Sequence, residues 1–207
     1  GGAGEQAGDR TFSGVSGKDS AGREALKRKK ENREMKVRLT VSIVFMILLM
    51  LVSMHHMFFM WLHLPVPEWL MKLFHGNENA LTFAFTQFLL TLPIIYVNRK
   101  YYQTGFKTLA HLSPNMDSLI AIGSGAALVY GVFAIYRIGY GLGHGNDALV
   151  SRYASDLYFE SAGMILALIT VGKYMESHSK GKTGEAIEKL MDLSPKTAIL
   201  LLENGEE

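Results

Sequence analysis

Four long apolar segments constrain this chain of 207 residues more than any other feature. They cover residues 39–62, 80–97, 119–138 and 157–175, and polar or breaker-rich stretches separate them. A bilayer core is spanned by about 20 predominantly apolar residues in a helix. The segments therefore predict an all-α membrane protein with four transmembrane helices in a lipid bilayer.

The composition excludes several classes of function. The chain has no cysteine, so it holds no disulfide, no thiolate metal site and no cysteine nucleophile. Its formal net charge is only +2 and no basic patch is interleaved with aromatics, so nucleic acid is not an expected partner. A Gly-Lys-Thr run at 181–183 lacks the upstream glycine of a phosphate-binding loop, where Glu176 stands instead. Three histidines on one apolar segment do not favour a haem site, whose axial ligands lie on opposite sides of the ring.

The regions around the apolar segments predict the domain organisation. Residues 1–34 are first rich in Gly, Ser and Ala and then densely charged, which favours a flexible tail and a charged, helix-prone linker. Residues 35–178 form the transmembrane region. Residues 179–207 continue with a charged helix and then a weakly alternating stretch at 196–202, which predicts a first β-strand. The chain does not begin with methionine and ends within this last region, so we expect a fragment of a longer protein.

Basic residues predict the orientation in the membrane. They cluster before the first apolar segment, around residues 99–107, and after Lys173, whereas the loops at 63–79 and 139–156 carry few of them. Loops rich in Lys and Arg stay in the cytoplasm. An even number of spans therefore predicts that both termini are cytoplasmic.

Residues 99–112 form an amphipathic segment between the second and third apolar segments. Basic side chains (Arg99, Lys100 and Lys107) alternate there with aromatic and aliphatic ones, which is typical of a segment that lies along a membrane surface. Gly105 stands in its middle and is a position at which a helix can bend. We therefore expect a kinked amphipathic surface segment.

Few polar groups stand at the ends of the apolar segments. Met116 and Asp117 open the third, Glu160 lies at the outer end of the fourth, and Glu176 follows its inner end. A thioether is a soft ligand suited to Cu(I), while Asp117 is explained by the favourable energy of an acid at a helix N-terminus. The orientation brings Met116 and Glu176 to the same face of the membrane, where they could receive a metal ion. Interfacial solvation is the alternative for both glutamates.

A cluster of soft side chains ends the first apolar segment. It comprises Met54, His55, His56, Met57, Met60 and His63. Helical spacing would align Met46, Met50, Met54 and Met57 along one stripe. This arrangement is typical either of a soft-metal patch or of a packing stripe with interfacial histidines, since Met commonly fills gaps between helices.

Several motifs, in the same order along the chain, resemble the copper-transporting P-type ATPases. They are Ser-Pro-Asn-Met-Asp-Ser-Leu-Ile-Ala-Ile-Gly at 113–123, Tyr-Phe-Glu-Ser-Ala at 158–162, Gly-Lys-Tyr-Met-Glu at 172–176, Gly-Lys-Thr at 181–183, Leu-Met-Asp-Leu-Ser-Pro-Lys-Thr-Ala at 190–198 and Ser-Met-His-His-Met at 53–57. The resemblance covers about residues 23–207, and it identifies 179–207 as the start of a β-rich actuator domain.

The resemblance implies a role for particular residues. It implies ATP-driven export of Cu(I), with Met116 and Glu176 at a cytoplasmic ion entrance and Glu160 on the release path. The surface segment, with Arg99, Lys100, Gly105 and Lys107, would dock a copper chaperone or the protein's own N-terminal metal-binding domain. Many members bend this segment at a Gly-Gly pair, whereas this chain has Thr104-Gly105.

The machinery for chemistry would lie outside this chain. It lacks the intramembrane Cys-Pro-Cys motif, the phosphorylated Asp and the domain that binds ATP and Mg²⁺, so the fragment holds no catalytic residue. A pump for Ag(I), Cu(II) or Zn(II) is one alternative, and a non-catalytic four-helix scaffold module in the membrane is another. We expect an integral protein of a bacterial plasma membrane.

Overall fold

The computed structural model describes the backbone of residues 12–192, and every regular element in that range is helical. In chain order the elements are α1 (Phe12–Ser53), α2 (His55–Trp61), α3 (Glu68–Phe74), the 3₁₀ helix η1 (Asn77–Asn79), α4 (Ala80–Val97), α5 (Arg99–Ala110), α6 (Met116–Gly143), α7 (Asp147–Ser155) and α8 (Phe159–Asp192). The predicted all-α fold is confirmed for this range. The strand predicted at 196–202 lies outside the described residues.

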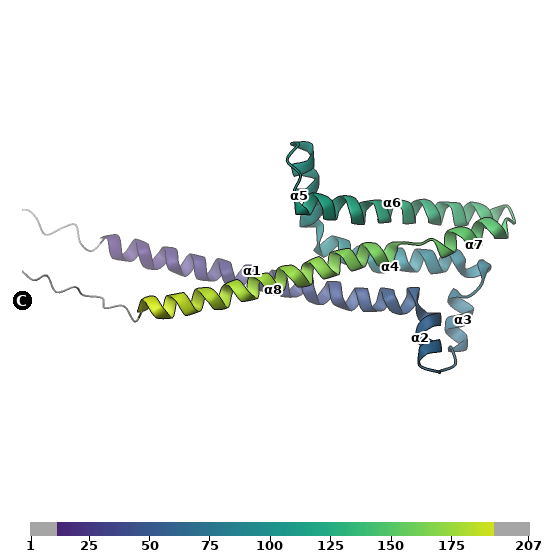
Figure 1. The fold of residues 1–207 in the computed structure, drawn as a ribbon, viewed down its shortest axis with the longest axis horizontal. Helices are drawn as coiled ribbons and strands as arrows, with labels where there is room; N and C mark the ends of the chain where they lie inside the picture. Colours follow the sequence, from purple (N-terminus) through teal and green to yellow (C-terminus); the bar gives the residue numbers. More distant parts are fainter. Residues whose placement is uncertain (1–11, 193–207) are drawn as a thin grey trace, which may run out of the picture. The chain divides into compact units, whose positions relative to one another are not determined.

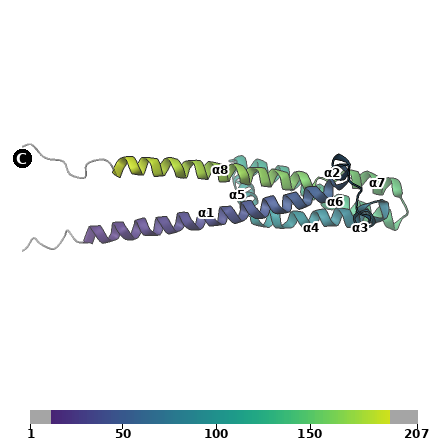
Figure 2. The same ribbon diagram turned by 90° about the horizontal axis from the view of Figure 1, so that it is seen from below.

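The chain divides into two compact units, Gly1–Thr170 and Val171–Glu207. The first unit contains α1 to α7 and the beginning of α8, and the second contains the rest of α8. In the first unit, the long helices α1, α4 and α6 run alongside one another (Figure 1). Helix α5 turns away at one end of this bundle, and the pair α2 and α3 turns away at the other (Figure 1). The rotated view also places α5 and the pair α2 and α3 at different ends of the bundle (Figure 2).

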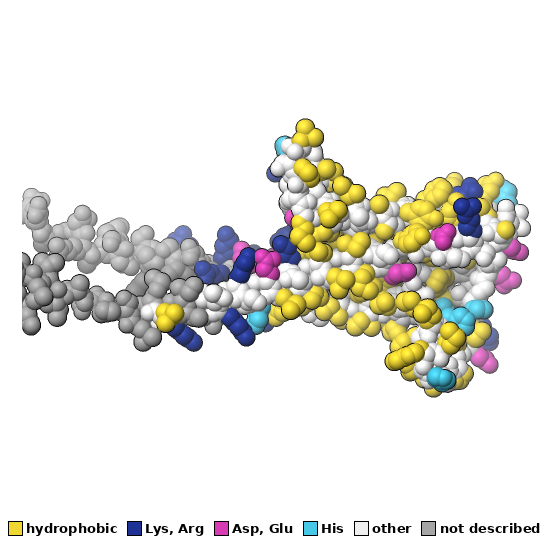
Figure 3. Space-filling model, viewed as in Figure 1, with side chains coloured by type: hydrophobic (Ala, Val, Ile, Leu, Met, Phe, Trp, Pro, Cys, Tyr) yellow, Lys and Arg dark blue, Asp and Glu magenta, His cyan; other side chains and the backbone are white. Residues whose placement is uncertain are grey.

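Four helical stretches are long and apolar enough to cross a membrane: Leu26–Ser53, Asn77–Val97, Met116–Gly143 and Asp147–Gly184. Their outward side chains are apolar as well, with Val129 72% and Leu168 60% exposed. Figure 3 shows hydrophobic side chains spread over the visible face of the bundle. Apolar surface of this extent is rare on soluble proteins, so the four predicted spans are confirmed as an integral membrane region.

The first span ends earlier than the sequence predicted. Helix α1 stops at Ser53, Met54 leaves the helical conformation with φ −110° and ψ 19°, and the chain continues as the separate helix α2. At its other end α1 begins at Phe12, inside the stretch expected to be a tail. Helix propagation adds a hydrogen bond for each residue fixed, so a formed helix extends outward more easily than a new one starts.

Two of the predicted loops contain short helices. Helix α3 begins after Pro67, within 63–79, and α7 lies within 139–156. The side-chain oxygen of Asn146 accepts a hydrogen bond from the backbone N–H of Leu149 at 3.1 Å and so caps α7. Such short amphipathic helices carry too few residues for periodicity to reveal them.

Small residues allow the helices of the first unit to approach closely. A Cβ atom added at Gly163 would lie 3.0 Å from Leu49 Cδ2 and 3.1 Å from Met46 Sδ, and one at Gly131 would lie 2.5 Å from the ring of Phe159. Leu49 and Phe159 are both fully buried. Close packing through glycine is the usual source of helix association in membranes, because lipid removes the hydrophobic driving force.

Candidate functional site

Met116 is the first residue of α6, and the residues around it explain why. Asn115 Oδ1 accepts a hydrogen bond from the backbone N–H of Ser118 at 3.0 Å, and Ser118 Oγ accepts one from the backbone N–H of Asn115 at 3.3 Å. This reciprocal capping box starts the helix at a defined residue. The Met116 side chain is 59% exposed. Its thioether is therefore held at a helix start and is accessible to an incoming ligand.

Helix α5 packs tightly against this helix start. A Cβ atom at Gly105 would lie 2.3 Å from the backbone oxygen of Asp117 and 2.9 Å from Ala121 Cβ, so only glycine fits at this crossing. Ser118 Oγ lies 2.8 Å from the Gly105 oxygen and 2.7 Å from Thr108 Oγ1. Thr108 and Ser118 were not predicted as contact residues, although small hydroxyl residues beside a glycine are a signal for such a crossing.

A second polar contact ties α5 to α6. The hydroxyl oxygens of Tyr102 and Ser124 lie 2.8 Å apart, and Ser124 is fully buried. Burial raises the pKa of the Tyr102 hydroxyl above its ordinary value, against a smaller lowering by the Ser124 contact. Tyr102 therefore stays protonated and neutral, and α5 and α6 form one joined element at this end of the unit.

The bend that precedes α5 lies at Asn98 and not at Gly105. Helix α5 continues through Gly105 without interruption, whereas Asn98 separates α4 from α5 with φ −101° and ψ 12°. The helix assignment shows no break at Gly105, and a kink there stays a prediction. Gly105 supplies the space for the close crossing with α6.

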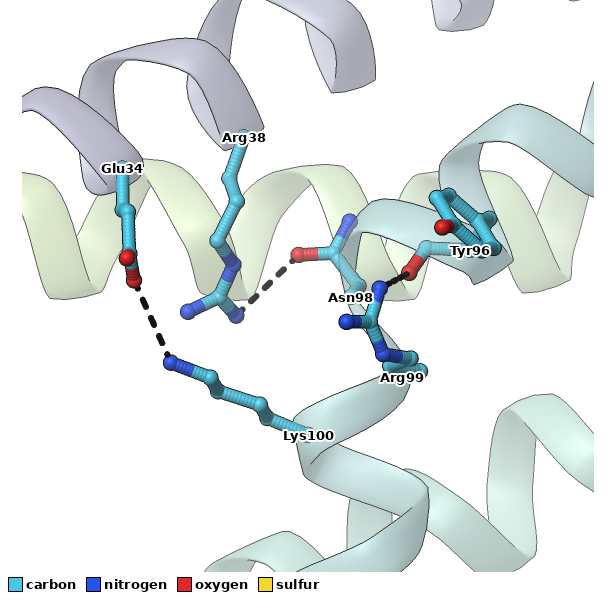
Figure 4. A network of polar contacts seen from close by, with 6 residues as sticks. All are labelled: Glu34, Arg38, Tyr96, Asn98, Arg99 and Lys100. Atoms are coloured by element: carbon cyan, nitrogen blue, oxygen red, sulfur yellow. Dashed lines mark hydrogen bonds and ion pairs between the residues drawn. The ribbon is translucent and has the colours of Figure 1, made fainter.

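The basic residues predicted to dock a donor all lie on α5 and all are exposed. The Arg99 guanidinium lies 4.9 Å from the centre of the Tyr96 ring and donates to the Tyr96 carbonyl at 3.3 Å. Lys100 Nζ lies 3.5 Å from Glu34 Oε2 on α1. Lys107 lies in the last turn of the helix, which its charge favours. Figure 4 shows the Arg99 and Lys100 side chains and their contacts at the root of α5.

Glu176 belongs to the second unit, and Met116 to the first. Glu176 Oε1 lies 2.6 Å from Lys180 Nζ, and its Oε2 lies 3.7 Å from Lys173 Nζ, so both neighbouring lysines of α8 face this carboxylate. Its side chain is 49% exposed. The structure thus shows Glu176 as an accessible carboxylate, and its pairing with Met116 stays a prediction.

Glu160, in the first turn of α8, has a defined partner. Ser53 Oγ donates a hydrogen bond to Glu160 Oε2 at 2.5 Å, across 107 positions of sequence. Ser53 is the last residue of α1. The contact joins the end of α1 to the start of α8 on the side of the bundle where α2 and α3 lie.

The soft side chains near α2 do not form the predicted stripe. The break at Met54 interrupts the helical spacing, so Met46 is buried in the bundle while Met57 lies on α2 and is 59% exposed. The ring centres of His56 and His75 are 6.0 Å apart. Among the side chains that the structure describes, however, no group of three or more His, Asp or Glu residues is placed to hold a metal ion. Figure 3 shows several of the His side chains where α2 and α3 lie, and others elsewhere on the molecule.

The fold and these side chains define a polytopic helical membrane protein with a thioether at a capped helix start. No family model matches the chain, and no solved structure matches it. It is 40% identical over 121 residues, 58% of the chain, to the copper-transporting ATPase HMA5 of Oryza sativa subsp. japonica. It is 33% identical over 87% of the chain to a copper-transporting ATPase of Helicobacter pylori, and 34% identical over 70% to the probable copper-importing P-type ATPase A of Enterococcus hirae.

The chain therefore belongs to the copper-transporting P-type ATPases, as the resemblance in its motifs implied. It spans between 11% and 23% of the length of these curated relatives. The match concerns the membrane part of a translocase. Of the actuator segment expected at 179–207, residues 179–192 are the end of α8, and residues 193–207 lie outside the described residues.

Proposed function

We propose that this chain forms the cytoplasmic ion entrance and the donor-docking region of an ATP-driven Cu(I) exporter. The observation that carries the proposal is Met116, an exposed thioether fixed by the capping box at the start of α6. Thioethers prefer Cu(I) to harder ions such as Mg²⁺. The names of the relatives, all copper-transporting or copper-importing, favour copper as the substrate.

The electrostatics of α6 are relevant to a cation at Met116. The N-terminus of a helix carries a partial positive charge, which opposes the approach of Cu(I). Asp117 places a carboxylate in the first turn and offsets that charge. Glu176 would add a second negative group at the entrance. Together a soft ligand and carboxylates would take the ion from a donor and pass it toward the membrane.

The other polar groups receive roles that follow from their positions. Arg99, Lys100 and Lys107 on α5 would attract an acidic copper donor, either a chaperone or the protein's own N-terminal metal-binding domain. Glu160, bonded to Ser53, would accept the ion on the release path. ATP and Mg²⁺ would be bound in domains beyond this chain. Both termini would be cytoplasmic, and labelling of single introduced cysteines with a membrane-impermeant maleimide tests that orientation.

The test uses the complete natural protein that contains this chain. Met116→Leu keeps the volume and removes the thioether, and Glu176→Ala removes the carboxylate. We expect each to raise the Cu(I) concentration needed for half-maximal ATPase stimulation by about tenfold, the scale on which loss of a metal-supporting group lowers affinity. Leu119→Ile, on an exposed position of the same helix, adds no metal ligand; it is the matched control and should leave stimulation unchanged.

The same assay can refute the assignment. Unchanged stimulation by both limiting and saturating Cu(I) in Met116→Leu would exclude Met116 from the ion entrance. Equal stimulation of the unsubstituted protein by Zn(II) would instead favour one of the alternative metals.

A further inference from the structure

Asn98 is a fully buried polar residue at the bend between α4 and α5. Buried polar side chains are costly unless they are hydrogen-bonded. Asn98 Nδ2 donates to Ser42 Oγ of α1 at 2.7 Å and to the Ile94 carbonyl at 2.9 Å. Its Oδ1 lies 2.8 Å from Thr170 Oγ1 of α8. One carboxamide thus contacts α1, α4 and α8.

The chemistry of the partners fixes the orientation of this carboxamide. Arg38 Nη2, which can only donate, lies 3.3 Å from Asn98 Oδ1. The Ile94 carbonyl, which can only accept, faces Nδ2. A flipped amide would set a donor against a donor and an acceptor against an acceptor. Ser42 and Thr170, both buried, lose a partner if Asn98 is removed.

Arg38 of α1, which donates to Asn98, also contacts α5. Its guanidinium lies 5.1 Å from the centre of the Tyr101 ring, and Tyr101 is a buried residue in the first turn of α5. Arg38 Nε is itself buried and has no hydrogen-bond partner among the described residues. Asn98 and the Tyr101 ring are therefore the contacts that hold this charge, as Figure 4 shows for Asn98.

Other residues of α5 contact α6 instead of α1 and α8. Gly105, Thr108 and Tyr102 tie α5 to α6. The N-terminal end of α5 is tied to α1 by the contacts of Asn98 and Arg38 and by the exposed ion pair of Lys100 and Glu34. Asn98 also contacts α8. An exposed ion pair contributes little, about 0–1 kcal/mol. The buried carboxamide is thus the main polar link of this end of α5 to α1 and α8, beside the apolar cluster in which Tyr101 packs with side chains of both helices.

We propose that Asn98 is a positioning residue that fixes the orientation of α5 relative to α1 and so presents the basic surface of α5 to a copper donor. The docking part of this statement rests on the proposed function. The positioning part does not, because it concerns the distance between two helices of the chain.

The first experiment measures that distance in the 207-residue chain in lipid nanodiscs. The chain has no cysteine, so introduced cysteines carry unique spin labels. The reporting pair is Lys30→Cys on α1 and Gln103→Cys on α5, and the control pair is Gln103→Cys with Val129→Cys on α6. Asn98→Gly keeps a residue that readily adopts the bend, while Asn98→Leu keeps the volume.

We expect both Asn98 variants to broaden or shift the α1–α5 distance distribution and to leave the α5–α6 distribution unchanged. Ser42→Ala with Thr170→Val, which removes the partners and keeps Asn98, should act in the same direction. An unchanged α1–α5 distribution in Asn98→Gly overturns the proposal. Equal broadening of both pairs also overturns it, because it indicates a general loss of packing.

The second experiment separates positioning from a merely structural role in the complete protein. Copper is supplied either as Cu(I)–glutathione or on an acidic Cys-x-x-Cys copper-carrier protein. For Asn98→Gly we expect KM for carrier-bound copper to rise about fivefold, because a misplaced surface loses preorganisation, with kcat and the KM for Cu(I)–glutathione unchanged. An equal rise for both copper forms, or a fall in kcat alone, contradicts the positioning role. Absence of any copper stimulation in the unsubstituted protein refutes the proposed function, and the distance measurement then decides the role of Asn98 alone.

Discussion

At Gly105 the side chain is absent because the backbone of α6 occupies its place. The backbone oxygen of Asp117 lies only 2.3 Å from the position that a Cβ atom of residue 105 would take. A backbone atom cannot rotate aside as a side chain can. The contact brings the start of α6 against α5 and leaves Met116 at the edge of the crossing. The position of the candidate ligand thus depends on a residue with no chemistry of its own.

Gly105→Ala is expected to destabilise the protein by about 1–3 kcal/mol, the usual cost of overpacking. Gly139→Ala in α6 is the matched control, since a Cβ there meets nothing within 4 Å and alanine is the better helix former. Thermal unfolding in detergent, followed by intrinsic fluorescence, compares the two variants. A Tm for Gly105→Ala equal to that of Gly139→Ala would contradict the tight crossing.

Among the helices, the features that depend on long apolar runs could be predicted from the sequence. Helix breaks and bends that depend on single contacts could not. The four spans and the amphipathic α5 follow from composition over many residues. The break at Met54 does not, because the apolar run continues through it into α2. The bend at Asn98 could have been suspected from a polar residue at the end of an apolar run, but its partners Ser42 and Thr170 come from distant helices.

The start of α6 can be tested through its cap. Asn115→Ala removes the acceptor for the Ser118 backbone N–H and should cost about 1 kcal/mol of stability. Asn115→Asp keeps an acceptor at the same position and should retain most of it. Chemical denaturation of the reconstituted chain measures the difference. Equal loss in both variants would contradict the cap as the source of this stability.

At the scale of the whole molecule, the comparisons account for what the fold alone does not. Four membrane helices are shared by many functions, and a fold by itself does not imply one. The candidate residues also differ in how far they could be predicted. Met116 was singled out by residue type and position, whereas the role of Glu160 came from the resemblance, and both roles stay predictions; the structure shows Met116 at a capped helix start and Glu160 hydrogen-bonded to Ser53. Glu176 belongs to the second unit and Met116 to the first, and their pairing stays a prediction.

We propose that this chain forms the membrane entrance of a copper pump. ATP-dependent accumulation of Cu(I) in inside-out vesicles tests this proposal most directly. Vesicles with the complete protein should accumulate Cu(I) when ATP and Mg²⁺ are added outside, and Met116→Leu should slow this at limiting copper by about tenfold. Accumulation of Zn(II) should not exceed that of empty vesicles. Copper accumulation that does not depend on ATP, or that is the same in Met116→Leu at limiting copper, would contradict the account.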